Sequence, residues 1–188
     1  MLDSGMALTK GIGFLNVRSF VRERFGDAAW DRVCASLTAA DLATVLAVAG
    51  VGWYDLNVYA RLIRGVDAGC GAGDLRLLSD LGRYEAEKDM NVLYRVLLRV
   101  ASPALIVEKT GAFWNRFHDT GKWEVERGDN RVTGVLSDWG VVDAALCNET
   151  LHYMARLLEL VGAKEVHGAH PRCRAQGQET CKFEMSWR

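Results

Sequence analysis

The chain has 188 residues, of which 49% are hydrophobic and 25% are charged, a composition that predicts one folded domain with a sizeable core. Lys and Arg together number 23 against 24 Asp and Glu, so the basic surplus needed to neutralise phosphates is missing and nucleic-acid binding is excluded. The longest near-apolar stretch, residues 42–53, is far shorter than the roughly 20 residues of a membrane span. Residues 1–8 carry no export signal, so we expect a cytoplasmic protein.

Helical periodicity dominates the chain up to about residue 118. Apolar residues recur at helical spacing from Phe14 to Phe25 and stop near Gly26, which predicts the first helix. The glycine-rich residues 67–73 lack the ending of a phosphate loop and predict a flexible connector. Further helices are predicted from Asp27, from Thr38 to Leu46, and over residues 54–66, 75–90, 92–100 and 104–118.

The pattern changes after Thr120. Apolar and charged residues alternate over 123–127, a turn follows at 128–130, and 131–136 form the returning strand. A long helix is predicted over 141–161, and two more strands over 164–174 and 180–187. The sequence therefore predicts one α+β domain over residues 1–188, with a poorly ordered start at 1–9. Its helical N-terminal two-thirds would pack on a small antiparallel sheet built as hairpin, helix, hairpin.

Three of the five cysteines cluster by spacing near the C-terminus. Cys173 and Cys181 are equidistant from Gly177, so a hairpin turn there would place their thiols opposite each other on the inward face. Cys147 lies near the start of the preceding helix, and His170 lies three residues before Cys173. Three thiolates and an imidazole are the ligands of a closed structural zinc site.

Other interpretations of these cysteines stay open. They can be ordinary core residues or a redox-active disulfide. Strict strand alternation places His167, and not His170, on the cysteine face. His170 reaches that face only if the chain bends, which Pro171 favours.

The spacing Cys147, then His170-x-x-Cys173-x7-Cys181-x-Phe183, resembles the end of the 4-vinyl-reductase domains. In the aromatic-sensing bacterial activators that contain this domain, zinc is held by a helix cysteine followed by Glu-x-x-Cys-x7-Cys. This chain has His170 in place of the glutamate. Because histidine is also a zinc ligand, the resemblance implies a zinc site of different charge.

The segment Lys10-Gly-Ile-Gly-Phe-Leu-Asn-Val-Arg-Ser-Phe resembles the opening of haem-NO-binding (H-NOX-related) domains. The middle of the chain, with Gly52-Trp-Tyr54 and Ser102-Pro103, resembles an uncharacterised relative of them that is frequent in myxobacteria. A haem sensor of this kind carries a histidine on the helix that corresponds to residues 94–102 and a Tyr-x-Ser-x-Arg pattern. Both are missing here, so we expect no haem. His118 is expected to be exposed or to cap its helix.

The expected role is binding. The sequence contains no Ser-His-Asp order and no dinucleotide fingerprint, and the acid pair Glu85/Glu87 is interpreted as a solvated face. Large aromatic residues near the first hairpin can wall a pocket for a small apolar or aromatic ligand or fill an ordinary core. They are Tyr84, Tyr94, Trp114, Phe117, Trp123 and Trp139.

We therefore expect a non-enzymatic small-molecule sensor or signalling domain with structural zinc. It would form a homodimer through its N-terminal helices and signal to a separate output protein. The alternatives are a protein-interaction adaptor with a filled interior, like the vesicle-tethering (TRAPP-subunit) relatives of similar fold, and, in third place, a haem-binding gas sensor.

Overall fold

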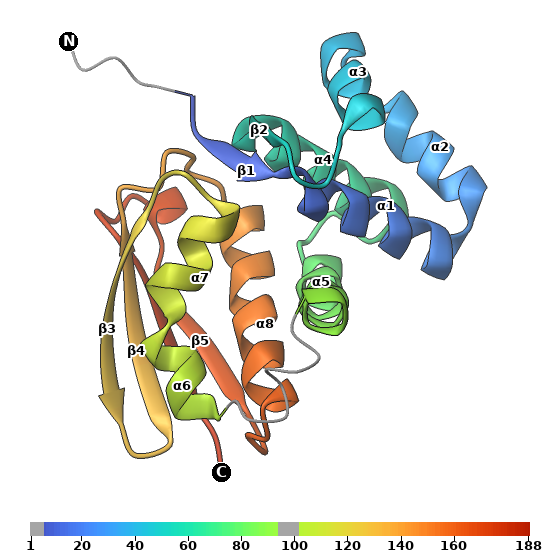
Figure 1. The fold of residues 1–188 in the computed structure, drawn as a ribbon. Helices are drawn as coiled ribbons and strands as arrows, with labels where there is room; N and C mark the ends of the chain where they lie inside the picture. The colour runs from blue at the N-terminus through green and yellow to red at the C-terminus, as the bar shows by residue number, and fades with distance from the viewer. Residues whose placement is uncertain (1–5, 94–101) are drawn as a thin grey trace, which may run out of the picture.

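The computed structural model describes residues 6–93 and 102–188. Figure 1 shows helices gathered at one side of the molecule and a twisted sheet at the other. In chain order the elements are β1 (Leu8–Lys10), α1 (Gly11–Phe25), α2 (Asp27–Ala35), α3 (Ala39–Ala47), β2 (Trp53–Asp55), α4 (Leu56–Cys70), α5 (Leu77–Leu93), α6 (Pro103–Glu108), α7 (Thr110–Phe117), β3 (Lys122–Gly128), β4 (Arg131–Ser137), α8 (Ala144–Leu160), β5 (His167–Arg172), η2 (Arg174–Gln176) and β6 (Cys181–Ser186).

The four-stranded sheet has the antiparallel order β3-β4-β6-β5. Side chains alternate along β6: Cys181, Phe183 and Met185 are buried, whereas the residues between them are not. This period of two gives the sheet one apolar face. Helices α6, α7 and α8 lie against that face, between the sheet and the N-terminal helices (Figure 1). The predicted α+β class and the hairpin–helix–hairpin order of the C-terminal third are confirmed.

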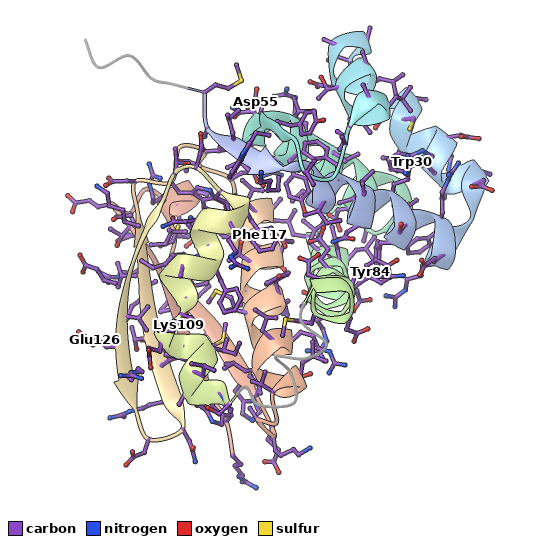
Figure 2. The ribbon with its side chains drawn as sticks, viewed as in Figure 1. Trp30, Asp55, Tyr84, Lys109, Phe117 and Glu126 are labelled. Carbon is purple, nitrogen blue, oxygen red and sulfur yellow. The ribbon has the colours of Figure 1, made fainter. Side chains whose placement is uncertain are left out.

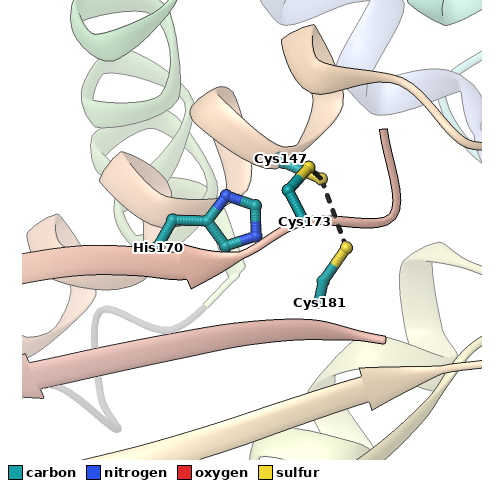
Figure 3. Close-up of side chains that lie close together, drawn as sticks. All are labelled: Cys147, His170, Cys173 and Cys181. Atoms are coloured by element: carbon teal, nitrogen blue, oxygen red, sulfur yellow. Dashed lines mark hydrogen bonds between the residues drawn. The ribbon is translucent and has the colours of Figure 1, made fainter. Parts of the chain in front are cut away.

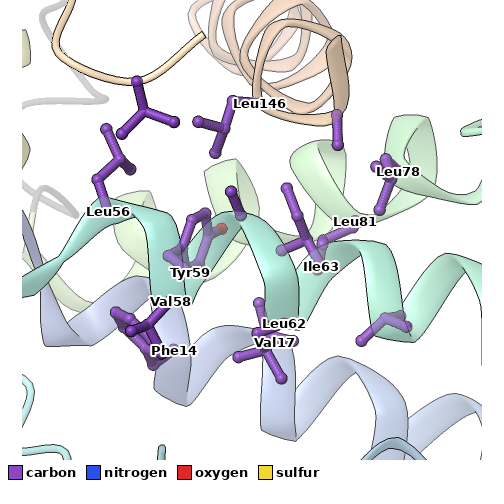
Figure 4. Close-up of a cluster of buried hydrophobic side chains, with 14 of the residues drawn as sticks. Phe14, Val17, Leu56, Val58, Tyr59, Leu62, Ile63, Leu78, Leu81 and Leu146 are labelled. Atoms are coloured by element: carbon purple, nitrogen blue, oxygen red, sulfur yellow. The ribbon is translucent and has the colours of Figure 1, made fainter. Parts of the chain in front are cut away.

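The two halves of the molecule meet where α5 packs along α8. Gly82 makes this contact possible, because a Cβ there would lie 2.3 Å from the carbonyl oxygen of Glu149. The close approach places one face of α5 directly beside the middle of α8. Around it, buried residues of α1, α4, α5 and α8 form one continuous core, in which Leu146 of α8 lies above Leu56 and Tyr59 of α4 (Figure 4).

Two short strands were not predicted. Leu8–Lys10 pairs with Trp53–Asp55, and Thr9 is buried, with its hydroxyl donating to the carbonyl of Phe117. The expectation that residues 1–9 are poorly ordered is therefore wrong for residues 6–9. Tertiary pairing with β2 and with the end of α7 orders a segment that has no strong pattern of its own.

Two other expectations need correction. Helix α4 continues to Cys70, into the glycine-rich segment expected to be a connector. Asp67 is buried in this extension, and its side chain accepts a hydrogen bond from the backbone N–H of Leu75 at 2.8 Å. The helix expected over 104–118 is broken into α6 and α7. The Thr110 hydroxyl donates to the carbonyls of Ile106 and Val107, competing with the helical ladder at the break. The helix expected over 92–100 lies mostly outside the described residues.

None of the helices in the described ranges combines the length and the apolar character that crossing a bilayer would require.

Candidate metal centre and ligand cavity

The side chains of Cys147, His170, Cys173 and Cys181 converge at one point (Figure 3), and their donor atoms all lie within 4.8 Å of one another. The Sγ atom of Cys147 is 3.6 Å from that of Cys181 and 3.8 Å from that of Cys173. Sulfurs bound at about 2.3 Å to one tetrahedral zinc ion would be about 3.8 Å apart. A disulfide needs about 2.05 Å, so the cluster has the spacing of a metal site and not of a disulfide.

Cys147 is positioned by the first turn of α8. Asp143 caps this helix: its side chain accepts a hydrogen bond from the backbone N–H of Ala145 at 2.7 Å. The Arg64 guanidinium of α4 holds the same carboxylate with two contacts of 2.8 and 2.7 Å. The helix start is therefore fixed from both sides, which sets the position of the Cys147 sulfur.

His170 reaches the cluster because β5 is irregular. The register of β5 against β6 shifts between Ala169 and Arg172, and this irregularity turns His170 to the cysteine face. His170 then stacks on Phe183 at 4.4 Å between ring centroids, and its Nε2 atom is buried with no hydrogen-bond partner in residues 6–93 and 102–188. His167, the alternative that strict alternation favours, is exposed and not part of the cluster.

The pKa values of two thiols in the cluster are shifted in opposite directions. The pKa of Cys181 is lowered to about 4, because Cys147 donates a hydrogen bond to its sulfur and His170 and the backbone N–H of Arg174 stabilise the same thiolate. The pKa of Cys147 is raised, because its proton is held in the hydrogen bond to Cys181, because burial disfavours a charge, and because its ionisation would place a second negative charge beside Cys181. A divalent cation would remove this repulsion and release the remaining protons.

A cavity of about 150 Å³ lies between the N-terminal helices and the C-terminal unit. Its lining comes from α1, α4, α5 and α8 on one side, and from α6, α7 and the sheet on the other. The first side contributes three buried carboxyl groups, those of Glu85, Asp89 and Glu149. The second contributes aromatic rings and His118. The cavity thus has an acid end and an aromatic end.

The acid end is a buried hydrogen-bond network. Tyr59 donates to Glu85 at 2.9 Å, and Asp89 accepts from Asn16 at 2.9 Å and from Tyr153 at 3.0 Å. Burial raises the pKa values of all three carboxyls, that of Glu149 to about 7. Glu85 and Glu149 also hydrogen-bond to each other, which requires one of them to carry a proton.

The solvated face expected at Glu85 and Glu87 is therefore wrong for Glu85. Only Glu87 faces outward, where it pairs with Arg156 at 2.8 Å. A sequence signal for the acid end existed: Leu78, Leu81, Gly82, Glu85 and Asp89 follow the helical spacing of one buried stripe. Charged residues on such a stripe mark a buried polar site, a signal that the immediate sequence neighbours of each acid do not carry.

His118 forms part of the aromatic end. Its ring stacks on Trp114 at 4.1 Å between centroids and meets Trp139 edge to face. Burial lowers the pKa of His118 to about 3, so the imidazole is neutral, and its Nδ1 atom has no hydrogen-bond partner in the described ranges. The expectation of an exposed or capping histidine is wrong, because α7 ends against the core and its last turn is covered by the loop that carries Trp139.

Of the aromatic residues expected to form a pocket, Trp114, Phe117 and Trp123 line the cavity. Figure 2 shows Phe117 between α7 and the N-terminal helices. Trp139 packs behind Trp114 at 5.0 Å without lining the cavity. Tyr84 lies elsewhere, against Phe20 on the outer side of α5, and Tyr94 lies outside the described residues.

No protein-family model and no curated protein matches the chain by sequence. Solved structures do match. An unliganded Fe(II) H-NOX mutant from K. algicida is 15% identical, with a TM-score of 0.72 over 95% of this chain and 96% of the other. An Fe(II)NO H-NOX protein from S. oneidensis is 13% identical, with a TM-score of 0.73 over 95% and 99%. A third structure, whose description names porphyrin distortion and haem redox potential, is 9% identical. Its TM-score is 0.67 over 94% of this chain and 99% of the other.

These neighbours correct two expectations. A haem-binding gas sensor was ranked last and haem was not expected, yet the similar structures are H-NOX proteins, among them Fe(II) and NO-bound forms. Both expectations depended on the missing histidine in the helix around residues 94–102, on the missing Tyr-x-Ser-x-Arg pattern, and on the expectation that His118 is exposed or caps its helix. The tertiary structure instead brings the His118 imidazole to the cavity from another segment. At this level of identity the likeness shows the architecture, and the chain has the H-NOX fold.

Proposed function

We propose that this chain is a sensor domain of the H-NOX type that binds haem in the cavity between its N-terminal helices and its C-terminal unit. The observation that carries the proposal is the neutral imidazole of His118, whose Nδ1 atom has no hydrogen-bond partner among the described residues, on the cavity wall of an H-NOX fold. A neutral histidine is a common axial ligand of haem iron. When bound, haem supplies an iron centre able to take up a diatomic gas.

The cavity offers a suitable ligand nitrogen for haem iron, but its volume is small for the porphyrin ring. His118 is desolvated, uncharged and held by Trp114 and Trp139, so its ligand nitrogen needs no deprotonation. The cavity of about 150 Å³ is smaller than the roughly 300–1,000 Å³ of ordinary ligand pockets. Haem entry therefore requires cavity-lining side chains such as the half-buried Phe117 to move outward.

The test is a titration of the purified chain with haemin, followed by the Soret band. The wild type is expected to give a saturable, shifted band, and His118→Gly to lose it and to regain it when imidazole is added. His152→Gly is the matched control, because His152 lies on α8 and its ring is bonded to the carbonyl of Asn148 outside the cavity lining. No saturable band in the wild type overturns the proposal.

We propose that the Cys147, His170, Cys173 and Cys181 cluster holds a structural zinc ion. Four protein ligands leave no open coordination position, so the ion would hold the start of α8 to the β5–β6 hairpin and activate no water. Elemental analysis is expected to find about one zinc per chain. Cys173→Ser is expected to lose it, whereas Cys70→Ser, a half-buried cysteine outside the cluster, keeps it. A metal-free wild type contradicts the site.

The remaining proposals concern assembly. We propose that the chain has a binding and not an enzymatic role. It would form a homodimer through the N-terminal helices and pass its signal to a separate output protein in the cytoplasm. The resemblance of the C-terminal hairpin to 4-vinyl-reductase domains supports the zinc cluster. Light scattering over a range of concentrations tests the dimer, and a mass that stays monomeric contradicts it.

A further inference from the structure

The charges around the cavity are unbalanced. Of the described residues that line it, three carry carboxyl groups and Lys10 alone carries a cationic side chain. Lys10 does not neutralise the acid end: its Nζ donates to the carbonyl of Val51 at 3.0 Å and lies 4.0 Å from the ring centroid of Trp53. The remaining titratable groups of the lining, Tyr59, Tyr153 and His118, are uncharged at neutral pH.

The three carboxyls differ in how fully they are engaged. Both oxygens of Asp89 already accept hydrogen bonds, from Asn16 and Tyr153. Within the part of the chain that the structure describes, Glu149 has only a long contact of 3.5 Å from Thr150 besides its interaction with Glu85. Glu149, helped by Glu85, is therefore the carboxyl with acceptor capacity left for a ligand.

The other end of the cavity also has unused polar atoms. Trp123 Nε1 and His118 Nδ1 are both buried without a hydrogen-bond partner among the described residues, and both residues line the cavity. Aromatic rings surround them, because Trp114 meets Trp123 edge to face at 5.6 Å and Trp123 lies against Phe183 at 5.3 Å. The surrounding rings suit a flat aromatic group, whose π face can accept a hydrogen bond from the Trp123 N–H, and the acid end suits a positive group.

We infer that the cavity binds a small organic cation in which an ammonium group is attached to a single aromatic ring, with the ammonium at Glu149 and Glu85 and the ring among Trp114, Trp123 and Phe117. The volume matches, because a cavity of about 150 Å³ holds one benzene-sized ring. The bound ammonium would balance the negative charge of Glu149, while Glu85, whose pKa burial raises well above its usual value, keeps its proton.

This inference goes beyond the proposed function and does not rest on it. The organic cation fits the cavity as it stands, whereas haem needs side chains to move. The two ligands are alternatives for one compartment, so each excludes the other.

The test uses benzylamine as the cationic ligand in calorimetric titrations of the haem-free full chain at pH 8, where the amine is still protonated and Glu149, with its pKa of about 7, is largely ionised. Benzyl alcohol is the neutral analogue of the same size, and benzoate the anionic one. Benzylamine is expected to bind at least about tenfold more tightly than benzyl alcohol, and benzoate not to bind. Equal affinities for the amine and the alcohol overturn the inference.

Two variants locate the site. Glu149→Gln keeps the shape of the side chain and removes its charge, so benzylamine affinity is expected to fall about tenfold. Glu87→Gln is the control, because Glu87 lies outside the cavity lining and pairs with Arg156. Equal binding by the two variants overturns the inference. If Glu149→Gln does not fold, Glu85→Gln replaces it with the same expected loss.

Haemin competition separates the two proposals. Benzylamine that binds to a chain unable to take up haemin supports this inference while the proposed function fails. Haem uptake without any benzylamine binding supports the proposed function and overturns this inference. Displacement of benzylamine by haemin supports both.

Discussion

The metal cluster and the cavity lie in the same domain but are built in different ways. Three of the four donors of the cluster come from one hairpin, within residues 170–181, and the fourth comes from the start of the helix before it. The cavity takes its lining from α1, α4, α5, α6, α7, α8 and the sheet. A site formed by short-range spacing can be predicted from sequence, whereas a site that needs several distant elements to pack together cannot.

This contrast predicts that the cluster and the cavity respond separately to perturbation. The largest effect is expected from removal of the proposed metal. An ion present at a thousandfold excess over its dissociation constant adds about 4 kcal/mol to the free energy of unfolding, so chelation should lower stability by that amount. Denaturant titrations with and without chelator measure it. Unchanged stability in a chain shown to contain zinc would contradict a structural role for the ion.

The second effect concerns pH and the acid end. Glu149 has a raised pKa of about 7 in the folded state, so the folded chain binds its proton more tightly than the unfolded chain does. Its stabilising contribution is full below about pH 4.5 and is lost as the pH rises towards 7, about 3 kcal/mol in all.

His118 acts with the opposite sign, because its pKa is lowered to about 3. Its contribution is present above about pH 6.5 and is lost as the pH falls below that value. Denaturant titrations of wild type and Glu149→Gln between pH 4.5 and 7 separate the two groups. Glu149 makes the free energy of unfolding fall as the pH rises. The Glu149→Gln variant lacks this decrease, so its free energy of unfolding should rise more steeply, or fall less steeply, with pH than that of the wild type. Identical pH profiles would show that Glu149 does not titrate in this range.

The third effect tests the helix contact beneath the cavity. Gly82→Ala places a Cβ against the backbone of Glu149, so α5 and α8 must separate, at a cost of about 2 to 3 kcal/mol. Gly111→Ala is the matched control, because no atom lies within 4 Å of its added Cβ and alanine favours a helix. Thermal unfolding compares the variants. If Gly82→Ala unfolds like the control, the close contact does not exist.

The smallest effect is expected from a single hydrogen bond of the acid end. Tyr59→Phe removes the hydroxyl that donates to Glu85 and leaves a buried carboxyl with one partner fewer, at a cost of about 1 to 2 kcal/mol. Zinc content should stay unchanged, because Tyr59 lies outside the cluster. Loss of zinc in this variant would show that the cavity and the cluster are coupled.

The sequence by itself determined the local features. The helical period over residues 14–25, the alternation of Cys181, Phe183 and Met185, and the spacing of Cys173 and Cys181 about Gly177 all appear in the structure as predicted. Each depends on residues a few positions apart, whose relation is fixed by helix or strand geometry.

Only the tertiary structure decided the rest. The irregularity of β5 chose His170 over His167, and the contact at Gly82 brought the acids of α5 beside Glu149 of α8. The end of α7 packed His118 between two tryptophans. In each case a side chain's protonation and accessibility depend on which distant segment covers it, because burial changes the free energy of a charged or polar group far more than its sequence neighbours do.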